Sequence, residues 1–259
     1  MKGPLLEVKE VCRSFGGLVA MDCVSFAVQP AEIRAIIGPN GAGKTTLFNV
    51  ISRVLDPDRG TIAFQGSPIQ HLQPHEAARL GITRTFQNLQ LFHNMTVLEN
   101  VMVGRHLRTR SNLQASALGL PWARRELAEA AAYAAGLLER VGLAEMLFQP
   151  AGELSLGQQR LLEMARALAL EPTLLLLDEP MAGLNAGERQ SLSHLIREVR
   201  TAGLTILFIE HDVEAVMGLA DRILVLDYGR PIAEGTPREI QNHPAVIAAY
   251  LGEEVKDVC

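Results

Sequence analysis

Strand-length segments rich in apolar residues alternate along this chain with segments whose apolar residues recur at helical spacing. Residues 32–37, 174–177 and 205–209 are of the first kind, and each is followed by a loop and a helical pattern. Short apolar runs bounded by turns are typical of strands buried on both faces, as in parallel sheets. The alternation therefore predicts an α/β fold with a mostly parallel sheet.

Two regions depart from this pattern. The first 30 or so residues and residues 61–65 alternate between apolar and polar positions, which predicts antiparallel strands at one side of the sheet. Residues 100–148 are rich in Ala, Leu, Glu and Arg, and within them residues 124–141 predict one long amphipathic helix.

These observations predict the domain organisation. We expect one domain over residues 1–259, with a helical lobe over roughly 89–160 inserted into the α/β core. A short helical tail is expected over residues 236–259.

Composition narrows the class of protein. With 48% hydrophobic and 20% charged residues, the 259-residue chain is not of the disordered or fibrous type. It has no uncharged apolar run of about 18 residues, and charges interrupt its first residues, so neither a membrane span nor a signal peptide is predicted. A net charge of −5 argues against a nucleic-acid partner. The three cysteines, Cys12, Cys23 and Cys259, lack CxxC spacing and favour a reducing compartment.

A glycine-rich loop follows the strand predicted at 32–37. Residues 38–45 read GPNGAGKT and match G-x-x-x-x-G-K-[ST], directly before a helix predicted over 44–54. In such loops the backbone N–H groups surround phosphates, the lysine (Lys44) reaches the β- and γ-phosphates, and the hydroxyl (Thr45) ligates Mg²⁺. The residues expected to bind nucleotide here are Gly38, Pro39, Asn40, Gly41, Ala42, Gly43, Lys44, Thr45 and Thr46.

Two carboxylates end the strand at 174–177. Asp178 and Glu179 lie at the carboxyl edge of the predicted sheet, where α/β proteins bind ligands. Asp178 suits a Mg²⁺ ligand and Glu179 a general base that activates water. His211 follows the strand at 205–209 closely, so we expect it near the γ-phosphate. Gln87 lies where the α/β pattern gives way to the helical one.

A further motif indicates the family. Residues 154–159, LSLGQQ, precede a helix upstream of the acidic strand, and with the motifs above, in this order, the chain resembles the ATP-binding-cassette (ABC) ATPases over essentially its whole length. Leu156 and Asn185 depart from the common pattern, which has Gly and Asp there. Both departures are similar to the branch that serves branched-chain amino acid importers. Arg53 stands where this family commonly has Gly.

The resemblance implies roles for individual residues. Phe15 would stack on adenine, although a core position for it is the alternative. Gln87 would contact Mg²⁺ or the attacking water and pass the nucleotide state to a membrane partner. His211 would form a hydrogen bond with the γ-phosphate and act in catalysis together with Glu179 and Gln87.

Residues 154–159, which correspond to the signature motif of the resembled family, imply a dimer. Ser155, Gly157 and Gln158 would bind the γ-phosphate of ATP held by the opposite subunit, so a second ABC ATPase subunit is expected, either a copy or a paralogue. The resemblance further implies two transmembrane permease subunits, an indirect substrate-binding protein, and a peripheral place on the cytoplasmic face of a bacterial-type inner membrane.

Three alternatives stay open. The transporter could carry urea, short amides or other amino acids instead of branched-chain ones. The chain could be an ABC ATPase of the DNA-repair or translation type. Those proteins resemble tandem cassettes or cassettes split by long coiled coils, whereas this chain resembles a single compact cassette. The third alternative is a P-loop nucleotide kinase or a regulatory nucleotide-binding switch, neither of which needs the motif at residues 155–159.

Overall fold

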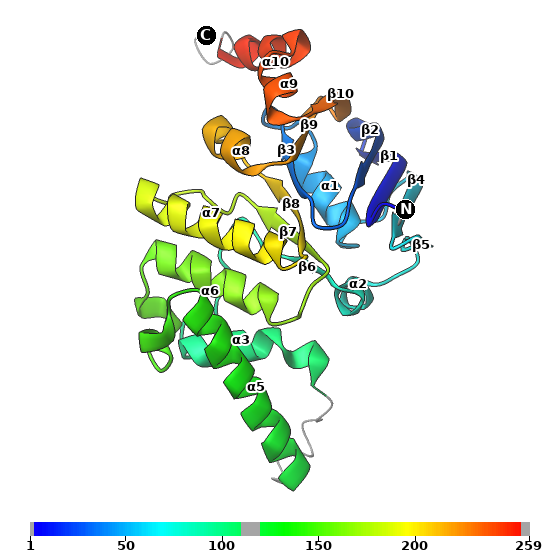
Figure 1. The fold of residues 1–259 in the computed structure, drawn as a ribbon. Coiled ribbons are helices and arrows are strands. Elements are labelled where there is room, and N and C mark those ends of the chain that lie inside the picture. The colour runs from blue at the N-terminus through cyan, green and yellow to red at the C-terminus, as the bar shows by residue number, and fades with distance from the viewer. Residues whose placement is uncertain (1–2, 110–119, 255–259) are drawn as a thin grey trace. The chain divides into compact units, whose positions relative to one another are not determined.

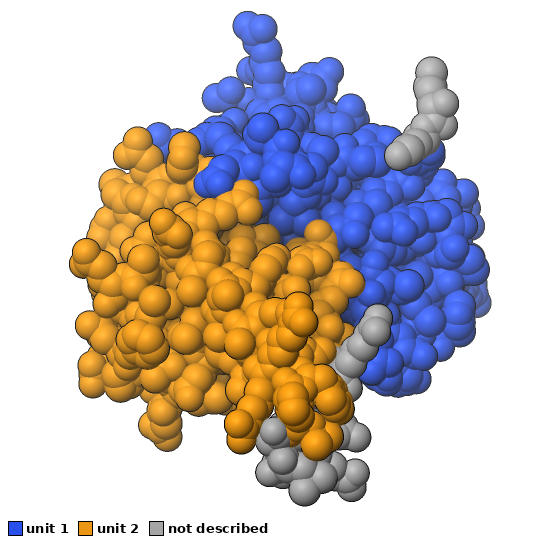
Figure 2. Space-filling view, turned by 60° about the horizontal axis from the view of Figure 1, so that its bottom comes forward, with its two compact units in different colours: residues 1–84, 173–180, 196–259 blue, residues 85–172, 181–195 orange. Residues whose placement is uncertain are grey.

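The computed structural model of this protein describes residues 3–109 and 120–254. The chain divides into two compact units, coloured separately in Figure 2. Unit 1 comprises residues 1–84, 173–180 and 196–259, and unit 2 comprises residues 85–172 and 181–195. Unit 2 thus includes the range 89–160 expected from sequence and extends past it on both sides. None of the helices in the described part of the chain combines the length and apolar character needed to cross a bilayer.

A largely parallel sheet forms the centre of unit 1. Within the described residues it has six strands in the order β10-β9-β3-β8-β7-β6, and only β10 runs antiparallel to its neighbour. The strands are β3 (Ile33–Ile37), β6 (Ile82–Arg84), β7 (Leu174–Asp178), β8 (Thr205–Ile209), β9 (Arg222–Asp227) and β10 (Arg230–Gly235). Every residue of β3, β7 and β8 is buried, which confirms the predicted parallel sheet.

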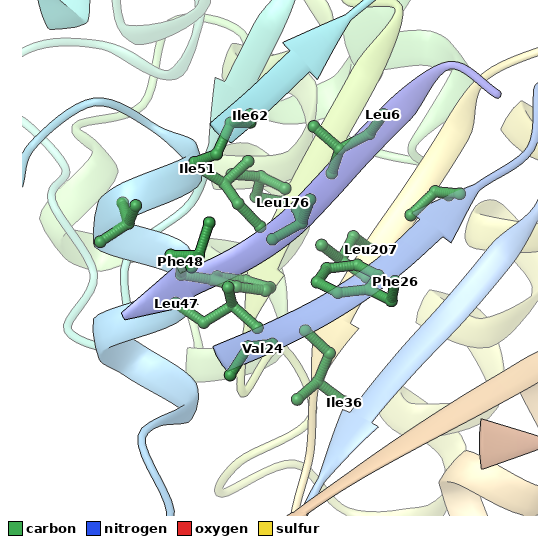
Figure 3. Packing of buried hydrophobic residues seen from close by; sticks show 14 of the residues in the cluster. Leu6, Val24, Phe26, Ile36, Leu47, Phe48, Ile51, Ile62, Leu176 and Leu207 are labelled. Atoms are coloured by element: carbon green, nitrogen blue, oxygen red, sulfur yellow. The ribbon is translucent and has the colours of Figure 1, made fainter. Parts of the chain in front are cut away.

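A second, antiparallel sheet in unit 1 confirms the other strand prediction. In the described part of the chain it has the order β2-β1-β4-β5, with β1 at Leu6–Phe15, β2 at Leu18–Val28, β4 at Arg59–Phe64 and β5 at Ser67–Pro68. Helix α1 (Lys44–Ile51) contributes its buried apolar side chains to a core shared by both sheets, as Figure 3 shows. Phe48 of α1 is wholly buried there and fixes the helix against strands of both sheets.

Helix α1 is shorter than the range 44–54 that its apolar spacing predicts. It ends at Ile51, and Arg53 adopts a left-handed backbone conformation, with φ of 64°. The Arg53 guanidinium is buried and donates to the carbonyl oxygens of Leu72, Leu55 and Gln70 and to the Asp56 carboxylate. These bonds offset the steric cost that a side chain meets in this conformation, where glycine is common.

The remaining helices of unit 1 are short. They are α2 (Pro74–Leu80), α8 (Val213–Leu219), α9 (Pro237–Gln241) and α10 (Pro244–Glu254). Helices α9 and α10 lie in the tail predicted as helical, of which residues 255–259 are outside the described residues (Figure 1). Helix α7 (Ala186–Thr201) begins among residues of unit 2 and ends among residues of unit 1.

Unit 2 is helical in its described residues. Its helices are α3 (Val97–Gly104), α5 (Pro121–Arg140) and α6 (Leu156–Leu168), with 3₁₀ turns at His106–Arg108, Ala144–Met146 and Ala151–Glu153. Helix α5 corresponds to the helix predicted over 124–141 but begins at Pro121, since proline suits the first helical position. Its buried residues recur at helical spacing and form one apolar face.

Candidate functional site

The glycine loop connects β3 to α1, and two of its glycines are required by close backbone approaches. A Cβ on Gly38 would lie 2.0 Å from the carbonyl oxygen of Leu226 in β9. A Cβ on Gly43 would lie 2.3 Å from the carbonyl oxygen of Ala20 in β2. Both glycines also have positive φ, of 149° and 94°. The loop is therefore curved and pressed against two strands in a way that only glycine permits.

Lys44 occupies the inside of this loop. Its Nζ donates to the carbonyl oxygens of Gly38, at 2.6 Å, and Pro39, at 2.8 Å, and the residue is only 7% exposed. Thr45 is exposed and Thr46 half-buried in the first turn of α1. An ammonium group inside a glycine loop at a helix N-terminus is an arrangement that binds phosphate groups.

The two carboxylates follow one another at the end of β7. Asp178 is the last residue of the strand and is buried, whereas Glu179 has a positive φ of 48°. The Glu179 N–H still donates to the carbonyl oxygen of Ile209 in β8, at 3.0 Å. A strained backbone of this kind is typical of functional positions. It gives adjacent residues different surroundings, one inside the fold and one partly open to solvent.

His211 meets Glu179 across the ends of β8 and β7. Its Nε2 lies 2.8 Å from Glu179 Oε1, and the side chains are 44% and 17% exposed, respectively. With Nε2 protonated, the imidazole donates to the carboxylate and holds it in one orientation. The two residues predicted separately from two strand ends are thus brought into direct contact.

Arg84 is a residue of the site that the sequence interpretation did not assign. It ends β6, next to β7, and its Nη2 lies 2.8 Å from Asp178 Oδ2, with the two side chains 7% and 3% exposed. Its Nη1 donates to Asn49 Oδ1 of α1 at 2.5 Å. Arg84 therefore fixes the Asp178 carboxylate relative to the helix that follows the glycine loop. No sequence pattern indicates this role, because it depends on β6 lying beside β7.

Phe15 lies at the tip of the β1–β2 hairpin. It pairs with Leu18, is 42% exposed, and has the Arg13 guanidinium 5.0 Å from its ring centroid. The alternative of a core position is therefore wrong. Ala20, two residues beyond Leu18, lies against the glycine loop at Gly43, so the hairpin that carries Phe15 passes beside that loop.

In unit 2, Ser155 is the N-cap of α6. Its side-chain oxygen accepts from the Gln158 N–H at 3.3 Å, and Gln158 Oε1 accepts from the Ser155 N–H at 2.9 Å. This reciprocal capping box uses the Gln158 side chain within the protein. Ser155 itself is exposed, and its hydroxyl can still donate to an anion at the helix N-terminus.

The segment around Asn185 accounts for the asparagine at this position and contacts both Leu156 and Gly157. Asn185 Oδ1 accepts from the Glu188 N–H and Glu188 Oε2 accepts from the Asn185 N–H, each at 3.0 Å, so Asn caps α7 as Asp would. A Cβ on the buried Gly157 would lie 2.3 Å from the Glu188 carboxylate. Leu156 lies against Gly183, where a Cβ would be 2.9 Å from the leucine Cδ2.

Gln87 is exposed, and side chains of α6 hold the segment that carries it. Arg160 Nη2 donates to the Gln87 carbonyl oxygen at 3.0 Å, and Arg166 donates to that of Gln90. Glu163 pairs with Arg160 at 3.3 Å and is buried, and this burial raises the pKa of Glu163. Gln87, Ser155, Gly157 and Gln158 all belong to unit 2, whereas the other predicted site residues belong to unit 1.

The residues of unit 1 form a coherent chemical set. A curved glycine loop with an internal lysine can hold a polyphosphate, and a carboxylate held by histidine can accept a proton. The Thr45 hydroxyl and the Asp178 carboxylate are hard oxygen donors of the kind Mg²⁺ prefers, so the residues present suit that ion.

Comparison with known families gives two matches. Residues 21–182 match the family model described as ABC transporter. Residues 230–256 match the model described as branched-chain amino acid ATP-binding cassette transporter.

Individual proteins are similar over almost the whole chain. The high-affinity branched-chain amino acid transport ATP-binding protein LivG of Escherichia coli K12 is 46% identical over 98% of this chain and all of its own. The corresponding protein BraF of Pseudomonas aeruginosa is 45% identical with the same coverage. A solved ATP-binding cassette of an ABC transporter in its ADP conformation has a TM-score of 0.85 and 34% identity, covering 96% of this chain and 99% of that one.

The family model covers more than half of the chain, and these relatives align with it almost from end to end. The glycine loop, the acidic end of β7 and the capped signature helix are the parts on which the resemblance rested, and the structure contains each of them. This chain belongs to the ATP-binding-cassette ATPases of ABC transporters.

Proposed function

We propose that this chain is the subunit that hydrolyses ATP to energise a membrane importer of branched-chain amino acids. The observation that carries the catalytic part is the 2.8 Å contact between Glu179 and His211 at the ends of β7 and β8. Of these two strands, β8 lies next to β3, which leads into the glycine loop. The cargo is inferred from the LivG and BraF relatives and from the match over residues 230–256.

ATP would be held through its phosphates by the glycine loop. Lys44 would turn from the carbonyls of Gly38 and Pro39 to the β- and γ-phosphates, while Phe15 would provide a stacking surface for adenine. Thr45 and Asp178 would hold Mg²⁺, with Arg84 orienting the Asp178 carboxylate and Gln87 contributing from unit 2. The ion would neutralise charge on the transferred phosphoryl group.

Hydrolysis needs a group that accepts the proton of the attacking water. Glu179 would take that role, since its partly exposed carboxylate lies at the sheet edge where the γ-phosphate is expected. His211 would orient Glu179 and donate to the γ-phosphate as its charge changes. His211 can donate to both groups at once when it is the imidazolium, in which each ring nitrogen carries a proton.

The dimer is the second part of the proposal. Ser155, exposed at the N-cap of α6, and Gly157, in the first turn of that helix, would bind the γ-phosphate of ATP held by a second cassette, a copy or a paralogue. Gln158 would support this through the capping box. Residues 1–259 would act as one ATP-binding domain on the cytoplasmic membrane face, attached to two permease subunits and served by a substrate-binding protein.

Uptake in a strain that lacks this gene tests the proposal. Wild-type protein should restore uptake of radiolabelled leucine, Lys44→Ala should not, and Arg125→Gln, at an exposed ion pair, should behave as wild type. Restored uptake of urea or a short amide in place of leucine would reject the cargo but keep the ATPase. Full leucine uptake with Lys44→Ala would reject the role of the chain in energising transport.

A further inference from the structure

Two thiols and a carboxylate lie together on the β1–β2 hairpin, outside the residues assigned above. Cys12 Sγ is 3.5 Å from Cys23 Sγ, and with an Asp22 carboxylate oxygen these ligand atoms all lie within 4.8 Å of one another. Cys23 is exposed and Cys12 half-buried, so the group can be reached from solvent.

A β-bulge produces this arrangement. Val11 pairs with Val24 and Arg13 pairs with Met21, so that Cys12 alone lies opposite both Asp22 and Cys23. Cys23 has a φ of 54°, a conformation uncommon for a residue with a side chain. The bulge turns three potential ligands toward one point, which regular pairing of the two strands would not do.

Other groups already orient these ligand atoms. The Cys23 N–H donates to Cys12 Sγ at 3.3 Å, and Arg230 donates from Nε and Nη2 to Asp22 Oδ2 at 2.8 Å and 2.6 Å. Hydrogen bonds of this kind to ligand atoms are typical around metal sites. Arg230 also lowers the pKa of Asp22, so this carboxylate is charged. The Cys12 thiol raises the pKa of Cys23 to about 11, so Cys23 carries its proton until something displaces it.

We propose that Cys12, Asp22 and Cys23 bind a thiophilic divalent cation of the zinc class. Tetrahedral zinc with sulfur ligands at about 2.3 Å would separate two sulfurs by about 3.8 Å, close to the 3.5 Å found here. Three protein ligands leave the fourth position to water. Binding would release two thiol protons to solvent and change no oxidation state.

The cluster is connected to the glycine loop through one turn. The Asp22 N–H donates to the Gly229 carbonyl oxygen at 2.9 Å, and the Gly229 N–H donates to that of Ala42 at 3.2 Å. A bound cation would hold Asp22 and thereby the turn at Gly229. We therefore expect a bound cation to change the affinity of the protein for ATP. This expectation rests on the proposed function, whereas the binding of the cation does not.

Metal titration of the nucleotide-free, full-length protein under reducing conditions tests the site. Zinc would be followed by competition with a chromophoric chelator, and cobalt by its thiolate-to-metal absorption. We expect one equivalent to bind, with Cys12→Ser and Cys23→Ser each weakening affinity at least about 10-fold. Cys259→Ser, which removes the third thiol, should leave binding unchanged.

Three binding results would overturn the proposal. They are failure of the wild-type protein to bind zinc or cobalt, undiminished binding when both Cys12 and Cys23 are serine, and loss of binding with Cys259→Ser. Thermal melting of each variant checks that it folds. A mass lower by two hydrogens, with Cys12 and Cys23 cross-linked despite reductant, would assign the pair to a disulfide and likewise reject the metal site.

Discussion

His211 Nε2 lies 2.8 Å from Glu179 Oε1, and the two residues come from the ends of neighbouring parallel strands. The left-handed backbone of Glu179 allows it to follow the buried Asp178 and still present its carboxylate at the sheet edge. A substitution that keeps the hydrogen bond but removes the basicity therefore separates geometry from chemistry at this position.

Glu179→Gln is that substitution. The amide oxygen can still accept from His211, while the proton acceptor is lost, so ATP turnover should fall by about 10²–10⁴ with ATP affinity unchanged. Steady-state phosphate release and equilibrium binding of a fluorescent ATP analogue measure the two quantities. Turnover close to wild type would show that Glu179 is not the general base.

Lys44→Ala should act on binding. It removes a charged donor expected to bond the phosphates, which is worth about 1.5–3 kcal/mol, or roughly 10- to 150-fold in the dissociation constant of ATP. Isothermal titration calorimetry measures this constant, and Arg125→Gln serves as the control for loss of a cation elsewhere. An unchanged constant for Lys44→Ala would contradict the phosphate-binding role of the lysine.

Arg84→Gln should destabilise the fold as well as the site. It leaves the buried Asp178 carboxylate without its arginine, and breaking a buried pair in this way costs about 3–5 kcal/mol. The exposed Arg125–Glu129 pair offers a matched control, for which Arg125→Gln should cost below about 0.5 kcal/mol. Urea unfolding measures both, and equal small losses would mean that Arg84 does not support Asp178.

Ser155 has a structural and a proposed functional role that two substitutions distinguish. Ser155→Ala should cost about 1 kcal/mol because α6 loses its cap, whereas Ser155→Asp keeps a capping oxygen. The aspartate nevertheless places negative charge where the γ-phosphate of the second cassette is expected. In the Glu179→Gln background, Ser155→Asp should therefore abolish ATP-dependent dimerisation, as measured by light scattering.

Thr96 provides the control for that experiment. It caps α3 in the same kind of capping box, with Glu99, so Thr96→Asp makes the same chemical change at another helix of unit 2. ATP-dependent dimerisation should survive Thr96→Asp. Dimers formed equally well by Ser155→Asp would reject the proposed contact between Ser155 and the phosphate.

The strands and the phosphate loop could be predicted because their signals are local. Buried strands such as β7 and β8 are short apolar runs, and the glycines of the loop are required by the backbone within one motif. The apolar spacing predicts the end of α1 too late, because this spacing continues to Val54 although the helix ends at Ile51. Arg53 turns the chain there through hydrogen bonds to Leu72 and Gln70, which lie 17 or more residues further along the sequence.

The features that sequence did not indicate depend on pairing across strands. Arg84 acquires its role only because β6 lies beside β7, and Cys12 meets Cys23 only because a bulge interrupts the β1–β2 register. Neither the neighbour of a strand nor a shift of one residue in register can be read from periodicity. Cysteine spacing alone gave no indication of a pair.

Helix α6 has a consequence for how unit 2 can move. Arg160 and Arg166 of this helix donate hydrogen bonds to backbone carbonyls in residues 87–90, and Ser155 caps its N-terminus. The Arg160 side chain is itself buried and paired with Glu163 of the same helix, so moving it out of its place would be costly. Ser155 and the backbone around Gln87 are therefore attached to the same helix, and we expect a displacement of α6 to move both.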